Sequence, residues 1–290
     1  AETNPQEVMD LSAVAHLATI KSRVPFINFF DGFRTSHEIQ KIQVWDYEDL
    51  KEMCDMDAVE AFRKRALNPE HAMMRGSHEN GDIFFQHREA SNKFYEAVPG
   101  IVEEYMGKVN AKLGTNYQLF NYYGAADADR VIIAMGSICD VAEEVIDYLN
   151  AHGEKVGLVK VRLYRPFRAD KLIAAIPETA KKIAVLDRTK EPGEPLYMDV
   201  VTALADAGIT DKVVTGGRYG LGSKDTPPAS VFAVYEELTK AEPKKMFTLG
   251  ITDDVTFLSL EEKPAPNTAA EGTTECKFWG LGGDGTVGAN

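Results

Sequence analysis

The sequence is poor in cysteine and in long hydrophobic runs. Its three cysteines, Cys54, Cys139 and Cys276, stand far apart among 290 residues. They form no CxxC pair, no zinc-ligand spacing and no quartet of the kind that holds an iron–sulfur cluster. No stretch reaches about 18 consecutive apolar residues, the length that spans a bilayer, so we expect no membrane segment. Sparse cysteines in an odd number are typical of a reducing compartment, and we predict a cytoplasmic protein.

Positive charge is also in short supply. The chain has 32 Lys and Arg residues against 45 Asp and Glu, a formal net charge of −13. Because nucleic-acid binding needs a basic face, this balance argues against a nucleic-acid partner. With 44% hydrophobic residues the chain can bury a sizeable core, in one large domain or two ordinary ones. It starts without methionine and stops inside a glycine-rich segment, so we interpret it as part of a longer polypeptide.

The most informative stretch is Arg130–Leu149. Val131–Met135 is apolar and rich in β-branched residues, which predicts a strand buried on both faces. Gly136 and Ser137 end the run, and apolar residues then recur at helical spacing, which predicts a helix with Ser137 as its N-cap. Strand, short turn and helix open a parallel α/β unit. The Gly-Ser turn is also explained by chain reversal alone, without a function.

The same alternation continues to about residue 260. Further strands are expected at Lys155–Leu163, Lys182–Leu186, Lys212–Thr215 and Met246–Leu249, and helices at Ala169–Ile176, Tyr197–Ala207 and Pro228–Lys240. This spacing predicts an α/β fold with a mostly parallel, doubly wound sheet. The pattern of residues 46–115 predicts an irregular helical connector, and the Pro- and Thr-rich residues 264–274 predict a linker.

Residues 1–45 resemble one piece of a domain. Glu7–Lys21 has helical spacing, Val24–Phe30 has the composition of a short strand, and a polar loop then leads to a second helix near Ile39. One helix and one strand cannot bury their own apolar faces. We therefore expect this segment to be mobile or to dock on a second copy of the chain.

Cationic side chains recur where the predicted strands end. Arg188 and Lys190 follow one strand, and Arg218 lies in the glycine-rich segment Gly216–Gly222 that follows the next. Ligands of doubly wound sheets bind at this edge, glycine lets backbone N–H groups approach an anion, and arginine holds phosphate in bidentate geometry. The residues we assign to an anion site here are Ser137, Arg188, Lys190, Arg218 and Gly220. Alternatively, these cations pair with the chain's own carboxylates or hold a neighbouring domain.

A second glycine-rich turn lies near the end of the sequence. Lys277–Gly280 is expected to begin a new strand, and Gly280–Gly285 follows it. Such a turn can cradle a phosphate at a helix N-terminus. We assign Gly282, Gly283 and Gly285 to a phosphate-binding or interdomain turn.

No nucleophile–base pair stands out. Asp31, His37 and Glu38 share one polar loop, an arrangement more typical of capping than of catalysis. The histidines within residues 71–87 lack the i, i+4 spacing beside a carboxylate that zinc sites use. We therefore assign no catalytic residue and no metal ligand.

Five motifs, in this order and spacing, resemble pyruvate:ferredoxin (flavodoxin) oxidoreductase. They are FFDGFRTSHEIQKI, VRLYRPF, VLDRTKEPG, GRYGLGSKD and CKFWGLGGDGTVGAN, and the match runs over nearly the whole chain. The resemblance implies oxidative decarboxylation of pyruvate with coenzyme A, which gives acetyl-CoA, carbon dioxide and reduced ferredoxin or flavodoxin. On this resemblance we assign Arg218 with its glycine loop, Arg188 and Lys190 to the phosphates of coenzyme A.

The resemblance further implies a division of the chain. Residues 1–45 would end a pyrimidine-type thiamine diphosphate domain, and residues 46–115 would be the helical connector. Residues 116–262 would be a transketolase C-terminal-like domain on the coenzyme A side, and residues 263–290 a linker with the start of a γ-type domain.

Several components of the family enzyme have no visible counterpart in this chain. Thiamine diphosphate, Mg²⁺ and [4Fe–4S] clusters belong to the full-length enzyme, so we expect the chain to be inactive alone. Its expected partners are the remaining domains of a homodimeric parent, with ferredoxin or flavodoxin as electron carrier. The alternatives are a purely structural spacer, or the equivalent part of another 2-oxoacid oxidoreductase.

Overall fold

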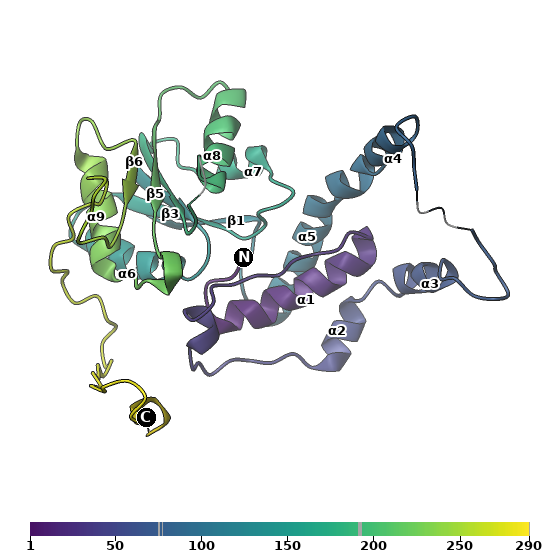
Figure 1. Cartoon of the computed structure of the whole chain (residues 1–290), viewed down its shortest axis with the longest axis horizontal. Helices are drawn as coiled ribbons and strands as arrows, with labels where there is room; N and C mark the ends of the chain where they lie inside the picture. Colours follow the sequence, from purple (N-terminus) through teal and green to yellow (C-terminus); the bar gives the residue numbers. More distant parts are fainter. Residues whose placement is uncertain (75, 77, 191–192, 290) are drawn as a thin grey trace.

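The computed structural model describes residues 1–74, 76, 78–190 and 193–289, and a six-stranded sheet forms its centre. In chain order the strands are β1 (Phe120–Gly124), β2 (Arg130–Ala134), β3 (Val156–Val161), β4 (Lys182–Asp187), β5 (Val213–Arg218) and β6 (Met246–Thr248). Their spatial order is β1-β3-β2-β4-β5-β6, and Figure 1 shows β6 and β1 at opposite ends of the sheet. Only β1 among them is antiparallel to its neighbour. The prediction of a mostly parallel α/β sheet is confirmed.

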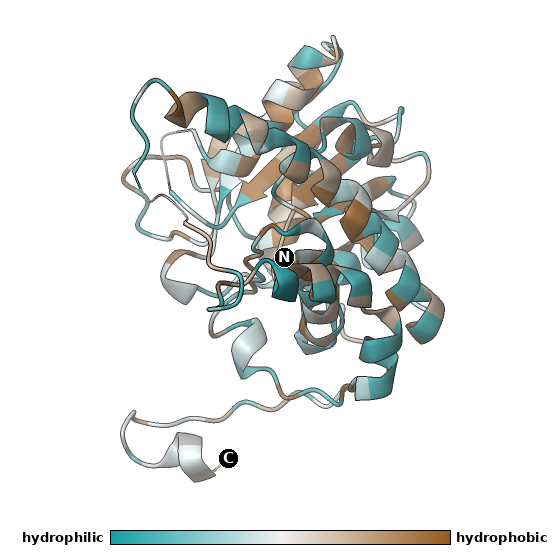
Figure 2. Ribbon diagram, turned by 90° about the vertical axis from the view of Figure 1, so that its right-hand side faces the viewer, coloured by the Kyte–Doolittle hydropathy of each residue, from teal (hydrophilic) through white to brown (hydrophobic). Residues whose placement is uncertain are grey.

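Helices cover both faces of this sheet. The helices that follow its strands are α6 (Ile138–Ala151), α7 (Ala169–Ala175), α8 (Pro195–Asp206) and α9 (Pro228–Thr239). Ile132 of β2 packs in the core beneath α6 and α9, whereas its neighbour Ile133 packs in the core on the α7 and α8 side. Both faces are therefore apolar, which explains why the strands are continuous hydrophobic runs. Figure 2 shows hydrophobic strands between helices of more mixed character.

The N-terminal helix docks on its own chain. α1 (Pro5–Ser22) lies beside α5 (Asn92–Leu113) (Figure 1), and both helices contribute to the core that includes the α7 and α8 side of the sheet. Leu11 and Leu17 of α1 are buried there with Val102 of α5. The expectation that residues 1–45 are mobile or need a second copy is therefore wrong for α1, because α5 supplies its apolar partner.

Two predicted elements of residues 1–45 do not form. Val24–Phe30 has no regular strand structure, and its one backbone bridge joins Phe30 to Glu2. No strand of the described chain lies beside this segment for it to pair with, and Ile27 remains 89% exposed. The helix expected near Ile39 is replaced by a single 3₁₀ turn, η1 (Thr35–His37).

Short helices and a tail complete the chain. The connector contains α2 (Tyr47–Met53), α3 (Met56–Lys64) and α4 (Phe84–Ala90), and α3 and α4 bury none of their residues. Beyond Leu260 the chain leaves the sheet and ends in α10 (Thr286–Ala289), and the strand predicted from Lys277 does not form (Figure 1). No helix of the described ranges is both long and apolar enough to cross a membrane.

The glycines after the fourth predicted strand have a packing role. Gly216 and Gly217 belong to β5, and not to the loop that the sequence predicts. A Cβ on Gly217 would lie 2.4 Å from the Phe247 ring and 2.6 Å from the Leu186 side chain. The Gly216 N–H donates a hydrogen bond to the Lys245 carbonyl at 2.9 Å, so it is not free to bind an anion. These two glycines therefore let side chains of β4 and β6 close over β5, and the prediction that they cradle an anion is wrong.

The outer edge of β6 is covered by the returning chain. The Thr248 N–H donates to the Leu258 carbonyl at 3.1 Å, and the Leu260 N–H donates to the Thr248 carbonyl at 3.0 Å. The last strand therefore has a partner on each side at this point.

Candidate functional site

The sheet has a switch point between β2 and β4. These strands are neighbours, but the chain continues from β2 to β3 on one side and from β4 to β5 on the other. Ligands of such sheets bind in the crevice at the carboxyl ends of the two strands. A crevice of about 270 Å³ opens here. Its lining includes Arg34, His37, Ser137, Arg188, Tyr219 and Lys224. Two of the predicted residues, Ser137 and Arg188, are thus brought together.

The Asp31 carboxylate is held beside this crevice by three contacts. Its Oδ2 accepts hydrogen bonds from the N–H and the Oγ of Ser137, both at 2.6 Å. Its Oδ1 lies 3.0 Å from Nη1 of Arg188. Gly136 makes room, because a Cβ at this residue, whose φ is +84°, would lie 2.5 Å from Oδ2. Asp31 thus brings a negative charge to the N-terminus of α6, where the helix dipole stabilises it.

This arrangement corrects the prediction for Ser137. The residue does occupy the N-cap position of α6, but its side chain makes no capping hydrogen bond. Its hydroxyl donates to Asp31 instead. The sequence contained no signal for this pair, because Asp31 and Ser137 are 106 positions apart.

Arg188 also binds the loop after β5. Its Nε donates to the Gly220 carbonyl at 3.1 Å. Gly220 has a φ of +65°, and a Cβ there would lie 3.0 Å from this same nitrogen. Gly220 therefore serves Arg188 as a hydrogen-bond acceptor, whereas its place in a glycine-rich segment predicted an N–H donor to an anion.

The other two predicted cations differ from each other. Arg218 ends β5 and is paired, with its Nη1 3.1 Å from Oε1 of Glu194, whose side chain is only 3% exposed. Lys190 is exposed on the loop after β4. The next residues of the VLDRTKEPG motif, 191 and 192, lie outside the described residues.

The second glycine turn lies apart from the crevice. Gly282, Gly283 and Gly285 are in the C-terminal tail, away from the sheet (Figure 1). All three have positive φ. The Asp284 carboxylate accepts from the N–H groups of Leu281 and Thr286 at 2.9 and 3.0 Å, which closes a local turn. The structure therefore does not bring these glycines to Arg188.

A buried ion pair ties α1 to the sheet. Arg162, directly after β3, donates from Nη1 and Nη2 to the two oxygens of Glu7 at 2.7 and 2.8 Å. Burial opposes ionisation of Glu7, but the hydrogen bonds and charge of Arg162 outweigh it and lower the Glu7 pKa to about 2. No motif or spacing in the sequence predicted this pair.

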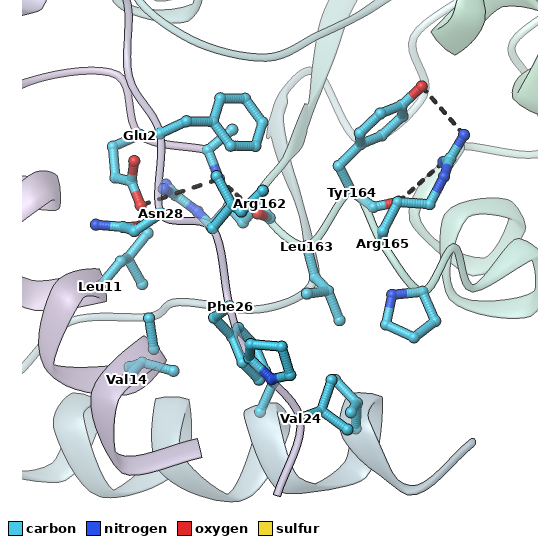
Figure 3. A pocket seen from close by; sticks show the side chains of 18 of the residues that line it. Glu2, Leu11, Val14, Val24, Phe26, Asn28, Arg162, Leu163, Tyr164 and Arg165 are labelled. Atoms are coloured by element: carbon cyan, nitrogen blue, oxygen red, sulfur yellow. Dashed lines mark hydrogen bonds and ion pairs between the residues drawn. The ribbon is translucent and has the colours of Figure 1, made fainter. Parts of the chain in front are cut away.

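A larger cavity of about 560 Å³ lies between α1, α5, residues 24–29 and the loop after β3. Figure 3 shows Glu2, Asn28 and Arg162 grouped at one end, with Val24 and Phe26 toward the other. Burial raises the pKa of Glu2 to about 7. The mostly apolar lining suits apolar surface better than an anion. Within the described ranges, no group of three His, Cys, Asp or Glu residues could hold a metal ion.

Two family models match the chain. The model described as pyruvate flavodoxin/ferredoxin oxidoreductase, thiamine diphosphate-binding, matches residues 1–107. The model described as pyruvate:ferredoxin oxidoreductase core domain II matches residues 128–231. Together the two matches include α1, the connector and most of the sheet.

Curated relatives match over the full length of the chain. A pyruvate-flavodoxin oxidoreductase of Enterobacter agglomerans is 58% identical over 294 residues, 100% of this chain and 25% of that protein. A pyruvate:ferredoxin oxidoreductase of Moorella thermoacetica is 59% identical over 288 residues, 98% of this chain and 24% of that protein. The chain thus spans about a quarter of the length of these relatives.

Among solved structures, a 2-oxoglutarate:ferredoxin oxidoreductase from Magnetococcus marinus aligns with a TM-score of 0.33 at 19% identity. That alignment covers 52% of this chain and 24% of the other.

Proposed function

Because the chain belongs to the pyruvate:ferredoxin (flavodoxin) oxidoreductase family, we propose that it supplies the coenzyme-A-side α/β domain of such an enzyme. The parent enzyme converts pyruvate, coenzyme A and an oxidised ferredoxin or flavodoxin into acetyl-CoA, carbon dioxide and the reduced carrier. It works as a homodimer, and its other parts hold thiamine diphosphate, Mg²⁺ and the [4Fe–4S] clusters. This chain alone has no oxidoreductase activity.

The proposal assigns a role to each part of the chain. Residues 1–45 end the pyrimidine-type thiamine diphosphate domain, and residues 46–115 connect it to the α/β domain. Residues 116–262 carry the coenzyme A side. Residues 263–290 link to a γ-type domain, and the glycine turn within them lies at the domain boundary.

The observation that carries the proposal is the crevice at the switch point. Arg188 and Lys224 line it, and Gly136 admits an anionic group, here the Asp31 carboxylate, beside the start of α6. At about 270 Å³ the crevice is smaller than sites for drug-sized ligands, which are about 300–1,000 Å³. It therefore accommodates one phosphate end of coenzyme A, and other domains hold the rest. We assign Lys190, two residues beyond Arg188 on the exposed loop after β4, to the same phosphate.

Calorimetry with coenzyme A at low salt tests this proposal. Because the site is incomplete, we expect a Kd on the order of 0.1–1 mM, or about 4–5 kcal/mol. Lys190→Ala should weaken binding several-fold, since it removes an exposed cation without leaving a buried partner. Arg63→Ala, on the exposed helix α3, should leave the affinity unchanged. Equal affinity in both variants would leave the site without support. Arg218→Ala is a poorer test, because it leaves the buried Glu194 carboxylate without its ion-pair partner.

A structural spacer is the second candidate function. The observation in its favour is that Arg188 and Arg218 are already paired with carboxylates of the chain. Arg34 likewise joins the N-terminal segment to Asp225 at 2.7 Å. Absence of any coenzyme A binding at 10 mM, in protein that unfolds cooperatively, would favour the spacer. Turnover of the parent enzyme with pyruvate and with 2-oxoglutarate distinguishes a pyruvate enzyme from another 2-oxoacid oxidoreductase.

A further inference from the structure

Within the crevice, a small group of hydrogen-bond donors is arranged around one carboxylate. We propose that Gly136, Ser137 and Arg188 form an oxyanion-binding site whose internal occupant is the Asp31 carboxylate. A phosphate group takes the same place when Asp31 is withdrawn. The inference deepens the proposed function if the ligand is coenzyme A, but it does not depend on that ligand.

The site has the parts that oxyanion binding requires. It offers two donors from Ser137, one backbone and one side chain, and a guanidinium from Arg188, all directed at a single carboxylate. Charge-assisted hydrogen bonds of this kind are the strong ones, and they recognise carboxylate and phosphate alike. Gly136 admits the oxygen at a distance that any side chain would block. Ser137 and Arg188 follow the last residues of β2 and β4 by three positions and one position, so the packed sheet restricts their movement.

The occupant, in contrast, is part of a segment with little regular structure. Asp31 follows Val24–Phe30, which forms no strand, and Phe33 beyond it is 67% exposed. The next residue, Gly32, has no atom within 4 Å of the position where a Cβ would be. Withdrawal of Asp31 leaves the sheet packed, but it must release the contacts that hold this loop to the rest of the chain. Arg34 donates to Asp225 and to the Ser223 carbonyl, and the buried Thr35 hydroxyl donates to the Thr3 carbonyl at 2.9 Å.

Withdrawal would leave a net positive site. The carboxylate is the ion-pair partner that the structure gives to Arg188, and Lys224 lines the same crevice. Among the described lining residues outside the N-terminal segment, which stay when Asp31 leaves, the one carboxylate is that of Asp225. A phosphate brings the negative charge that Asp31 now supplies, together with additional acceptor oxygens.

Titration of inorganic phosphate into the full chain tests the site directly. In low-salt buffer without other oxyanions, calorimetry should show Asp31→Ala binding phosphate about tenfold or more tightly than the unaltered chain, because the donors become free. Asp211→Ala makes the same change in net charge at an exposed position paired with Lys181, and its phosphate affinity should equal that of the unaltered chain. The double variant Asp31→Ala/Arg188→Ala should lose the gain.

A second measurement uses the unaltered chain, so it tests the site even if the Asp31→Ala variant folds poorly. Hydrogen exchange of the unaltered chain should show residues 24–38 exchanging faster as phosphate rises, while β2 stays protected. If Asp31→Ala is folded yet binds phosphate no better than Asp211→Ala, the inference is wrong. If phosphate leaves residues 24–38 unchanged at saturation, it is also wrong. Phosphate binding without coenzyme A binding would overturn the proposed function and leave this site standing.

Discussion

Arg162 and Glu7 form a two-pronged ion pair whose side chains are only 5% and 10% exposed. The pair joins the end of β3 to α1, and the loss of either partner leaves a buried charge without compensation. We expect Arg162→Met to lower the free energy of unfolding by about 3–5 kcal/mol. Urea denaturation monitored by circular dichroism measures this loss.

The control for this variant is an exposed pair. Arg168 lies 2.6 Å from Asp170 at the surface, and Arg168→Ala should cost less than about 1 kcal/mol. The double variant Glu7→Leu/Arg162→Met should be more stable than Arg162→Met alone, since it buries no charge. If the double variant proved less stable than Arg162→Met, an unpaired buried charge would not explain the loss.

Stability should fall steeply in acid because of Glu7. Its pKa is about 2 in the folded protein, against an ordinary value of 4.5. Because the folded pKa is the lower one, the stabilising contribution is complete above about pH 4.5 and is lost as the pH falls toward 2. The contribution amounts to roughly 3 kcal/mol. Urea unfolding across this pH range should give a shallower slope for Glu7→Gln, and an identical slope would contradict the assignment.

Gly217→Ala should destabilise the sheet. The added Cβ would meet Phe247 and Leu186 at distances that real Cβ atoms do not show, so overpacking should cost about 1–3 kcal/mol. Gly107→Ala is the matched control, because position 107 in α5 is open and alanine favours a helix by about 0.8–1.0 kcal/mol. Thermal melts should move in opposite directions for the two variants. An unchanged melting temperature for Gly217→Ala would contradict the close packing of Phe247 and Leu186 against β5.

Hydrogen exchange should divide the N-terminal residues into two classes. The amides of α1 should be protected to a degree similar to those of β2, since both belong to the buried core on one side of the sheet. Residues 24–33 should exchange faster than α1, because they form no regular element and Ile27 is almost fully exposed. Rapid exchange throughout α1 would contradict its docking on α5.

Local patterns in the sequence were enough to predict the strands and helices of the α/β domain. The buried run Val131–Met135 and the helix after it have periodicities that reveal strand and helix directly. The Asp31–Ser137 contact has no such signal, since it depends on how two segments 106 positions apart meet. Glycine was ambiguous for a similar reason. Gly217 would permit a loop, and only the neighbouring Phe247 ring explains why the strand needs it.

The strand prediction at Val24–Phe30 shows a different limit. Its composition favours a strand, but a strand forms only where a neighbour accepts its hydrogen bonds, and the described chain offers none there. Likewise, the arginines at the strand ends were correctly placed near an edge of the sheet. Which carboxylate each would pair with could not be derived from spacing.

The covering of β6 by residues 258–260 has a consequence for association between molecules. An open strand edge offers unpaired backbone groups to any other extended chain, and it is a common starting point for aggregation. Here the N–H and the carbonyl of Thr248 are already hydrogen-bonded to the returning segment. Addition of a foreign strand at this side must first displace that segment, so the domain is protected from open-ended sheet growth at β6.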